Sequence, residues 1–272
     1  MQKNTVKKIR KWLLLVIAVY VVTGTVLFFL QEKILFHPVR LSAEYNYSFS
    51  IPFKEINLAV NNEKNLNIIQ FTVPDTVCKG IVLYFHGNKN NIERYAPYAI
   101  NFTKSNYEVW MMDYPGFGKT TGKLTEQIMY DDAAILYQMA RARFPKDSII
   151  IYGKSLGTGV ASQLASVRDC KRLILETPYY SVEEMMNDRI FFYPVSLIAK
   201  YHFPNYKYFK RIEAPVTMFH GTKDELVPYK HSVKLAKENP AVNLVTIEKG
   251  KHNNLNDSPL FHQQLDSLLQ LP

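Results

Sequence analysis

Cysteine is scarce in this 272-residue sequence, and neither a fixed-period repeat nor a low-complexity run is present. The two cysteines, Cys78 and Cys170, are too few for a disulfide framework. Each precedes a predicted strand, and we place those strands apart in the sheet, so we expect two free thiols. Hydrophobic residues make up 47% of the chain and charged residues 21%, which excludes wholesale disorder. The length suffices for one substantial core but not for two large catalytic domains.

Basic clusters are also missing beyond the N-terminal segment, although the formal net charge is +9. Without the five basic residues of that segment, 28 basic residues face 24 acidic ones, an excess of 4. So small an excess without a Lys/Arg cluster argues against a nucleic-acid partner. The five residues lie where there are no acids, at Lys3, Lys7, Lys8, Arg10 and Lys11.

One long apolar run follows this basic cluster. Residues 12–30 contain no charge and are dominated by Leu, Val, Ile and Phe. As a helix they would extend about 28 Å, near the thickness of a hydrocarbon core. We therefore predict a single-pass transmembrane anchor. Because the basic residues precede it, we expect residues 1–11 in the cytoplasm and the catalytic domain on the non-cytoplasmic side, whether periplasmic, extracellular or lumenal.

A cleaved signal peptide is the main alternative to this anchor, and a buried core helix is a lesser one. A signal peptide normally has an apolar region of about 7–15 residues that ends at small residues. Here the small residues at 23–25 are followed by further apolar residues, which favours an uncleaved anchor. Residues 31–52 are interpreted as a linker that packs onto the domain. In it, Leu35, Phe36 and Val39 lie either on the bilayer surface or in the core.

Residues 53–272 are predicted to form one catalytic domain. Strands at 53–60 and 66–73 flank a polar turn and form an antiparallel hairpin. Strands and helices alternate after it, which predicts an α/β fold with a mostly parallel sheet and helices on both faces. Ligands bind such sheets at the carboxyl ends of the strands. The further strands are expected at 80–85, 108–113, 148–152, 173–176, 216–220 and 243–248, and the helices at 92–104, 125–144, 156–167 and 229–239.

The strand at 148–152 leads into Gly153-Lys154-Ser155-Leu156-Gly157 and then into a helix. Strand, G-x-S-x-G and helix together are typical of a nucleophile elbow, in which the serine occupies a strained turn. The adjoining helix N-terminus favours developing negative charge. We therefore predict Ser155 as the nucleophile. Lys154 beside it is interpreted as a solvated lysine, with contact to an anionic substrate as the alternative.

A serine nucleophile needs a base and an orienting acid, and their chain order in this motif is serine, acid, histidine. Asp224 follows the strand at 216–220, and His252 follows the strand at 243–248, so both lie at strand ends. Glu225 is the nearest rival of Asp224, which we prefer because the shorter side chain comes first after the turn. Among seven histidines, only His252 combines this order with a strand-end loop.

The oxyanion hole is expected to use two backbone N–H groups. One belongs to Leu156, directly after the nucleophile. The other belongs to Asn88, on the loop after the strand at 80–85, where Gly87 allows close approach of the backbone. His86 precedes the serine in the chain, so we interpret it as a structural support of this loop.

Taken together, these segments resemble the α/β-hydrolase superfamily, and especially its small membrane-anchored members with a His-Gly-Asn oxyanion loop. Carboxylesterases, lysophospholipases, protein depalmitoylases and serine aminopeptidases are related. The resemblance implies a Ser155–His252–Asp224 triad, with the Asn88 and Leu156 N–H groups as the oxyanion hole and no metal or organic cofactor. The absence of an HGGG loop argues against the hormone-sensitive-lipase-like branch. The matching segments, in family order, are YFHGN, DYPGFGKT, IYGKSLGTGVA, FHGTKDELVP and GKHNN.

The superfamily usually inserts a lid after the strand at 173–176, and residues 177–213 are rich in aromatic side chains here. Such a lid beside a membrane anchor suits a small-molecule or lipid-like acyl substrate, although ordinary packing of the insertion explains it equally well. We expect a serine hydrolase that cleaves an ester or thioester through an acyl-enzyme. An amide-cleaving serine aminopeptidase and a non-catalytic scaffold with the same fold are the alternatives.

Overall fold

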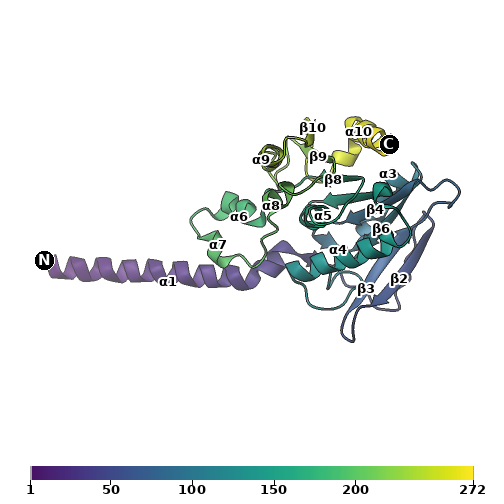
Figure 1. Ribbon diagram of the computed structural model, residues 1–272. Helices are drawn as coiled ribbons and strands as arrows, with labels where there is room; N and C mark the ends of the chain where they lie inside the picture. Colours follow the sequence, from purple (N-terminus) through teal and green to yellow (C-terminus); the bar gives the residue numbers. More distant parts are fainter. Residues whose placement is uncertain (1, 272) are drawn as a thin grey trace.

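The computed structural model describes residues 2–271, and Figure 1 shows a long N-terminal helix that projects from an α/β domain. This helix, α1 (Gln2–Leu35), is continuous, so it begins before the predicted apolar segment 12–30 and ends after it. Its part from Asn4 to Leu35 is long and apolar enough to span a membrane. At a rise of 1.5 Å per residue, this part of the helix is about 48 Å long.

An eight-stranded sheet forms the centre of the domain, in the order β10-β9-β8-β7-β4-β6-β3-β2. Neighbours from β10 to β6 pair in parallel, and β3 and β2 add an antiparallel hairpin at one edge, which confirms the predicted fold class. The strands are β2 (Phe53–Ala59), β3 (Asn65–Phe71), β4 (Gly80–Phe85), β6 (Tyr107–Met112), β7 (Ile149–Lys154), β8 (Arg172–Glu176), β9 (Val216–Gly221) and β10 (Asn243–Ile247).

Helices cover both faces of this sheet. Ile81 and Leu83 of β4 point to one face while Val82 and Tyr84 point to the other, as the alternation of strand side chains requires. Both faces are covered, which is why the central strands are continuous apolar runs. One face is covered by α4 (Glu126–Arg141), α5 (Gly157–Ala165), α8 (Asn205–Phe209) and α9 (Lys230–Glu238), and the other by α2 (Ile92–Tyr95), α3 (Ile100–Thr103) and α10 (Pro259–Gln270).

Local sequence sets the helix boundaries. The Thr125 side chain accepts a hydrogen bond from the Ile128 N–H and so caps the start of α4. The predicted helix 92–104 is wrong as a single element, because it is divided into α2, a 3₁₀ turn (Ala96–Ala99) and α3. Pro97 explains the division, since proline has no N–H and its ring clashes with the carbonyl four residues earlier.

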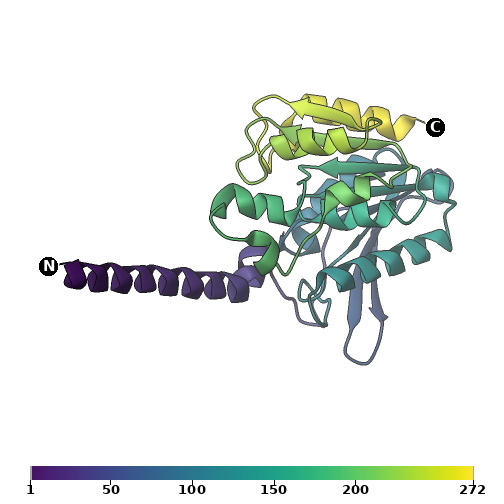
Figure 2. The same cartoon turned by 60° about the vertical axis from the view of Figure 1, so that its left-hand side comes forward.

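The segment between β8 and β9 forms a cap beside α1. It contains α6 (Val182–Ile190), α7 (Val195–Ile198) and α8. Figures 1 and 2 both place α6 and α7 next to the end of α1 that adjoins the domain, with the C-terminus far from them. Phe36, directly after α1, is buried in the core, where its ring lies 4.8 Å from that of Tyr201.

A separate, two-stranded pairing joins the chain after α1 to the loop that follows β4. β1 (His37–Pro38) pairs in parallel with β5 (Lys89–Asn90), the segment that follows β4. The end of the long helix is therefore fixed to a loop at the carboxyl edge of the sheet.

The start of α5 packs so closely on β4 that only glycine fits there. A Cβ atom on Gly157 would lie 2.0 Å from the Phe85 carbonyl oxygen. We expect Gly157→Ala to lower the free energy of unfolding by about 1–3 kcal/mol or more, because the backbone must move apart. Denaturant unfolding of the full chain in detergent measures this. Gln163→Ala on the same helix is the control, and equal stability of the two variants would contradict the prediction.

Candidate active site

Ser155 lies on a strained turn between β7 and α5. Its φ angle is +51°, in the left-handed region that a residue with a Cβ adopts at a cost of about 1–3 kcal/mol. The Ser155 N–H donates to the Glu176 carbonyl at 2.9 Å, and the Ser155 carbonyl accepts from the Thr158 N–H at 2.9 Å. These bonds at both ends hold the turn and leave the hydroxyl at the edge of the sheet.

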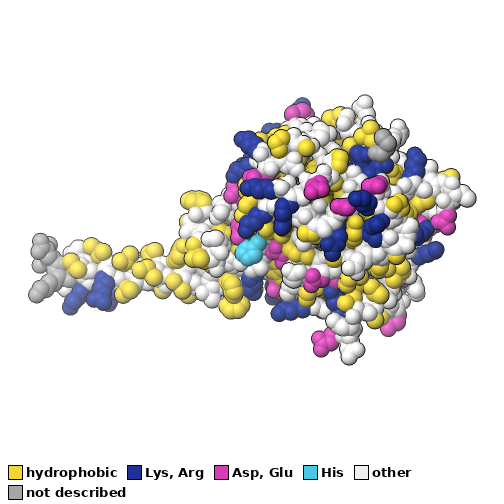
Figure 3. Space-filling model, in the orientation of Figure 1, with side chains coloured by type: hydrophobic (Ala, Val, Ile, Leu, Met, Phe, Trp, Pro, Cys, Tyr) yellow, Lys and Arg dark blue, Asp and Glu magenta, His cyan; other side chains and the backbone are white. Residues whose placement is uncertain are grey.

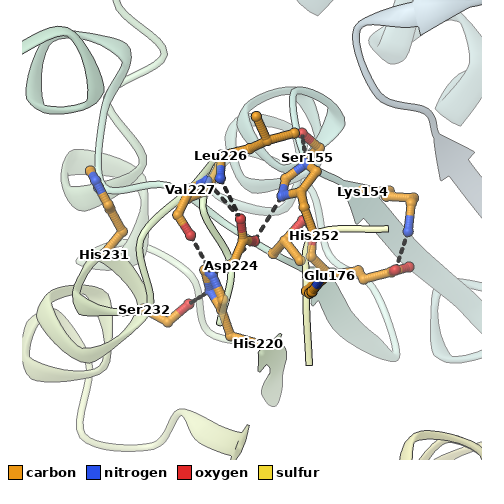
Figure 4. A network of polar contacts seen from close by, with 12 residues as sticks. Lys154, Ser155, Glu176, His220, Asp224, Leu226, Val227, His231, Ser232 and His252 are labelled. Carbon is orange, nitrogen blue, oxygen red and sulfur yellow. Dashed lines mark hydrogen bonds and ion pairs between the residues drawn. The ribbon is translucent and has the colours of Figure 1, made fainter. Parts of the chain in front are cut away.

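Three predicted site residues lie together in a hydrogen-bonded row at that edge (Figure 4). His252 Nε2 is 2.8 Å from Ser155 Oγ, and His252 Nδ1 is 2.7 Å from Asp224 Oδ2. A carboxylate only accepts, so Nδ1 carries the proton and Nε2 accepts from the serine hydroxyl. Glu225, the rival acid, is exposed.

Asp224 is held as a carboxylate by several donors. Its Oδ1 accepts from the Leu226 and Val227 N–H groups at 2.9 and 2.8 Å. Burial alone would raise the pKa of Asp224, but hydrogen bonds from His220 and His252, together with the charge of His252 and the Val227 N–H, hold it well below its usual value. The carboxylate is therefore ionised at neutral pH.

His220, which sequence reasoning missed, lies directly beside Asp224. Its Nε2 is 2.8 Å from the Val227 carbonyl oxygen and 3.3 Å from Asp224 Oδ2, so Nε2–H donates to this side. Its Nδ1 then accepts from the Ser232 hydroxyl at 2.6 Å. His220 is fully buried and fixes both the acid and the loop that carries it. The signal in the sequence is a histidine at the end of a mostly apolar strand.

The two N–H groups predicted to form the oxyanion hole belong to segments that meet beside Ser155. The loop after β4 passes so close to the serine that a Cβ atom on Gly87 would lie 3.6 Å from the Ser155 Cβ. Gly87, Asn88, Ser155 and His252 line the same small pocket. Among residues 2–271, neither the Asn88 N–H nor the Leu156 N–H has an acceptor in the protein. Both groups are therefore available to a bound oxygen.

Asn88 is fixed from behind by the end of α1. Its side-chain amide donates to the Leu35 carbonyl at 2.6 Å, and its own carbonyl accepts from the His37 N–H at 2.8 Å. Leu35 is the last residue of α1, so its carbonyl is one of those that a helix leaves unpaired. The loop in front of Ser155 is thus bound directly to the long N-terminal helix.

His86 lies under the same loop and away from Ser155. It is fully buried, with Nε2 3.2 Å from Asp113 Oδ1 and with its backbone carbonyl accepting from the Tyr114 hydroxyl at 2.8 Å. Burial raises the pKa of Asp113, against the lowering effect of His86. Asp113 also accepts from the Ile92 N–H at 3.0 Å. The pair therefore joins three segments of the domain.

The interpretation of Lys154 as a solvated residue is wrong. Its side chain is buried and forms an ion pair with Glu176, at the end of the neighbouring strand β8. Glu176 also accepts from the Tyr152 hydroxyl at 2.5 Å. The two residues stand side by side in the parallel register of β7 and β8. A pairing between strands is not visible in a motif, which is why the sequence suggested a free lysine.

This buried pair predicts a stability effect. Glu176→Gln removes the countercharge and leaves the Lys154 ammonium buried, so we expect a loss of about 3–5 kcal/mol in the free energy of unfolding. The double variant Lys154→Met/Glu176→Gln should recover most of that loss, because no charge then remains buried. Denaturant unfolding measures both. Asp169→Asn in an exposed ion pair is the control, and a Glu176→Gln protein as stable as this control would refute the assignment.

The chain is similar in sequence to a known family and to several curated proteins. Residues 76–208 match the family model described as serine aminopeptidase, S33. The chain is 30% identical over 194 residues to the α/β hydrolase domain-containing protein 17C of Xenopus tropicalis, an alignment that covers 70% of this chain and 60% of that protein. For the human protein of the same name the values are 29%, 70% and 56%. The chain thus spans about 60% of the length of the curated relatives it matches.

Solved structures share the fold at low sequence identity. An esterase of Pyrococcus furiosus superposes with a TM-score of 0.66 at 19% identity, covering 87% of this chain and 97% of that one. A Butyrivibrio proteoclasticus protein with bound ferulic acid gives a TM-score of 0.62 at 19% identity, covering 76% and 94%. The architecture is therefore the α/β-hydrolase fold. With the family and sequence matches, the chain belongs to the α/β-hydrolase superfamily.

Proposed function

We propose that this protein is a membrane-anchored serine hydrolase that cleaves an ester or thioester of an acyl or lipid-like substrate. The observation that carries the proposal is the position of His252, hydrogen-bonded to Ser155 Oγ on one side and to Asp224 on the other. The strained elbow at Ser155 supports it, because that strain is characteristic of nucleophilic serines in this fold.

In the acylation step, His252 Nε2 takes the proton from the Ser155 hydroxyl while Oγ attacks the substrate carbonyl carbon. Asp224 holds the imidazole in the required tautomer and stabilises the imidazolium that forms. The oxygen of the tetrahedral intermediate accepts from the Asn88 and Leu156 N–H groups. Removing one such donor in a comparable hydrolase costs about 2.7–4 kcal/mol of transition-state stabilisation.

The second half of the cycle releases the acyl group. His252 donates its proton to the leaving alcohol or thiol as the tetrahedral intermediate collapses to an acyl-Ser155 ester. Water then attacks this ester, with His252 again taking a proton, and Ser155 regains its hydrogen when the carboxylic acid leaves. None of these steps requires a metal or an organic cofactor.

The substrate class rests on the surroundings of this site. We propose that α1 anchors the chain, with the basic residues before position 12 in the cytoplasm and the domain on the other side of the bilayer. The aromatic cap and the membrane then lie on the same side of the molecule. An acyl chain is the ligand that such surroundings favour.

Amide hydrolysis is the second candidate, and the match to the serine aminopeptidase model favours it. Parallel assays with p-nitrophenyl esters of increasing chain length and with aminoacyl p-nitroanilides separate the two. Cleavage of the anilides with no cleavage of the esters would replace the esterase proposal by the aminopeptidase one.

An activated serine predicts covalent labelling by a fluorophosphonate probe. We expect the full chain in detergent to be labelled, and Ser155→Ala to lose the label completely because the attacking oxygen is gone. His252→Ala and Asp224→Asn should be labelled far more slowly, with esterase turnover reduced roughly 10⁴-fold. In-gel fluorescence and initial rates measure the two effects.

His262→Ala is the matched control for these variants, because His262 lies on α10 and contacts the Asn256 carbonyl rather than the serine. It should be labelled like the wild type. A folded wild-type chain that resists the probe would support instead a non-catalytic scaffold that has retained the fold.

The link between Asn88 and α1 predicts a separate effect on turnover. Asn88→Ala keeps the backbone N–H but removes the bond to the Leu35 carbonyl, so the loop is held less firmly in front of Ser155. We expect kcat to fall by about 10–100-fold, since small displacements of positioning groups have effects of this size. Lys79→Ala, at an exposed position just before β4, should retain wild-type kcat. A raised KM with an unchanged kcat would contradict the positioning role of the Asn88 side chain.

A further inference from the structure

The cap contains an uncharged apolar stretch that the hydrolase chemistry does not use. Residues 190–199, here called the cap tip, lie between Arg189 and Lys200 and include no charged side chain. Phe191 is 82% exposed and Leu197 is 80% exposed, the largest values among the large apolar side chains described outside α1. An apolar stretch of this length with flanking cations is typical of a segment that enters a membrane surface without crossing it.

Aromatic rings connect the cap tip to α1 in one continuous row. Tyr193 stacks on Tyr20 of α1 with ring centroids 4.5 Å apart and planes 10° apart. Phe192 lies 5.0 Å from Tyr193, and Phe191 lies 5.6 Å from Phe192. The Tyr20 hydroxyl donates to the Phe192 carbonyl, and the Tyr193 hydroxyl donates to the Tyr20 carbonyl, both at 3.0 Å. The cap tip is therefore seated on α1 by specific contacts.

A second pair of contacts fixes the other end of the cap tip. The Gln31 side chain donates to the Ile198 carbonyl at 2.6 Å and accepts from the Lys200 N–H at 2.8 Å. The Lys200 ammonium lies 4.6 Å from the centroid of the Phe28 ring. The cap tip thus follows α1 from Gln31 back to Tyr20.

The position of Tyr20 within the apolar run determines how deep this contact lies. Tyr20 precedes Leu30, the last residue of the uncharged run, by ten residues, which is about 15 Å along a helix. A hydrocarbon core is about 30 Å thick. If α1 spans the bilayer, the cap tip cannot contact Tyr20 without entering the acyl-chain region beside it. Figure 3 shows that this part of the surface, where α1 meets the domain, is largely hydrophobic.

The backbone of the cap tip suits such an environment. Buried polar groups in hydrocarbon must be paired, and Pro194 has no N–H to pair. The N–H groups of Tyr193, Val195, Leu197 and Ala199 all donate to carbonyls within the cap tip, at 2.8–2.9 Å. The carbonyls of Phe192 and Ile198 accept from α1.

We propose that the cap tip is a membrane-embedded element that lies among the acyl chains of the bilayer, against α1, and brings the active-site entrance to the lipid phase. This proposal rests on the anchoring role proposed for α1.

A direct link leads from the cap tip to the candidate active site. Arg189, directly before the cap tip, donates to the Leu226 carbonyl at 2.7 Å, and Leu226 lines the pocket that contains Ser155 and His252. The occupant of the exposed face is therefore membrane lipid, and a lipid-borne ester reaches the serine without crossing water.

Depth measurements in vesicles test this proposal. In a background with Cys78→Ser and Cys170→Ser, a nitrobenzoxadiazole fluorophore is attached at Phe191→Cys or, separately, at Leu197→Cys. Val16→Cys on α1 reports insertion of the anchor, and Val167→Cys, an exposed apolar position after α5, is the aqueous control. The full chain is reconstituted in phosphatidylcholine vesicles with or without nitroxide-labelled lipid.

We expect labels at 16, 191 and 197 to emit at shorter wavelength and to lose most of their fluorescence to the nitroxide lipid, while the label at 167 is unaffected. The proposal would be overturned if the labels at positions 191 and 197 were as unaffected by nitroxide lipid as the label at 167, while the label at 16 was quenched. Labels at 191 and 197 that emit at short wavelength without lipid quenching would also overturn it, because a protein surface would then cover them. An unquenched label at 16 would remove the anchor and the proposal together.

Fluorophosphonate labelling of the same samples separates this proposal from the proposed chemistry. If the fluorophosphonate reacts while the fluorophores at 191 and 197 remain in water, the proposed hydrolase function stands and only the embedded cap tip is refuted. Quenching at 191 and 197 without probe labelling retains the embedded cap tip and refutes the hydrolase. As a second readout, Phe191→Ser/Leu197→Ser should lower hydrolysis of a long-chain ester in vesicles about tenfold relative to a short soluble ester. An unchanged ratio would count against the proposal, and Val167→Ser is the matched control.

Discussion

The contact between Gly157 and the end of β4 is the constraint on which the active site depends. With no Cβ at this position, the first turn of α5 approaches the Phe85 carbonyl closely, and Ser155 and the loop after β4 line the same pocket. The strain at Ser155 is sustained because the surrounding backbone is bonded at both ends of the turn. A rigid sheet edge thus holds Ser155 in a conformation that a free loop would abandon.

The same edge is tied to the N-terminal helix, so α1 and the candidate active site are mechanically one unit. The carbonyl of Leu35, which the end of α1 leaves free, is bonded to the Asn88 side chain, and β1 pairs with β5 directly after Asn88. A flexible linker would let the domain tumble above a membrane. Here the orientation of the active site relative to α1 is fixed by hydrogen bonds within a few residues of the oxyanion loop.

Much of this architecture could be predicted from the sequence because its signals are local. Continuous apolar runs indicate the central strands, and the glycines around Ser155 together with the order of Asp224 and His252 indicate the candidate site. The failures concern contacts between distant segments. The sequence favours a solvated Lys154 because its partner Glu176 lies on a neighbouring strand. It gives no role to His220, because that role depends on how β9 meets the next loop. The helix at 92–104 failed for a local reason that periodicity concealed, namely Pro97.

The long helix touches the active site from two directions, and this arrangement has a consequence for access. At its end, α1 holds the loop that carries Asn88. About one to four turns earlier it holds the cap tip, which in turn leads through Arg189 to Leu226 beside His252. A substrate dissolved in water gains nothing from such a placement, since most of the domain surface is open to it. A substrate that resides in a bilayer gains a short path, because the surface that carries it runs along α1 toward the pocket that holds Ser155.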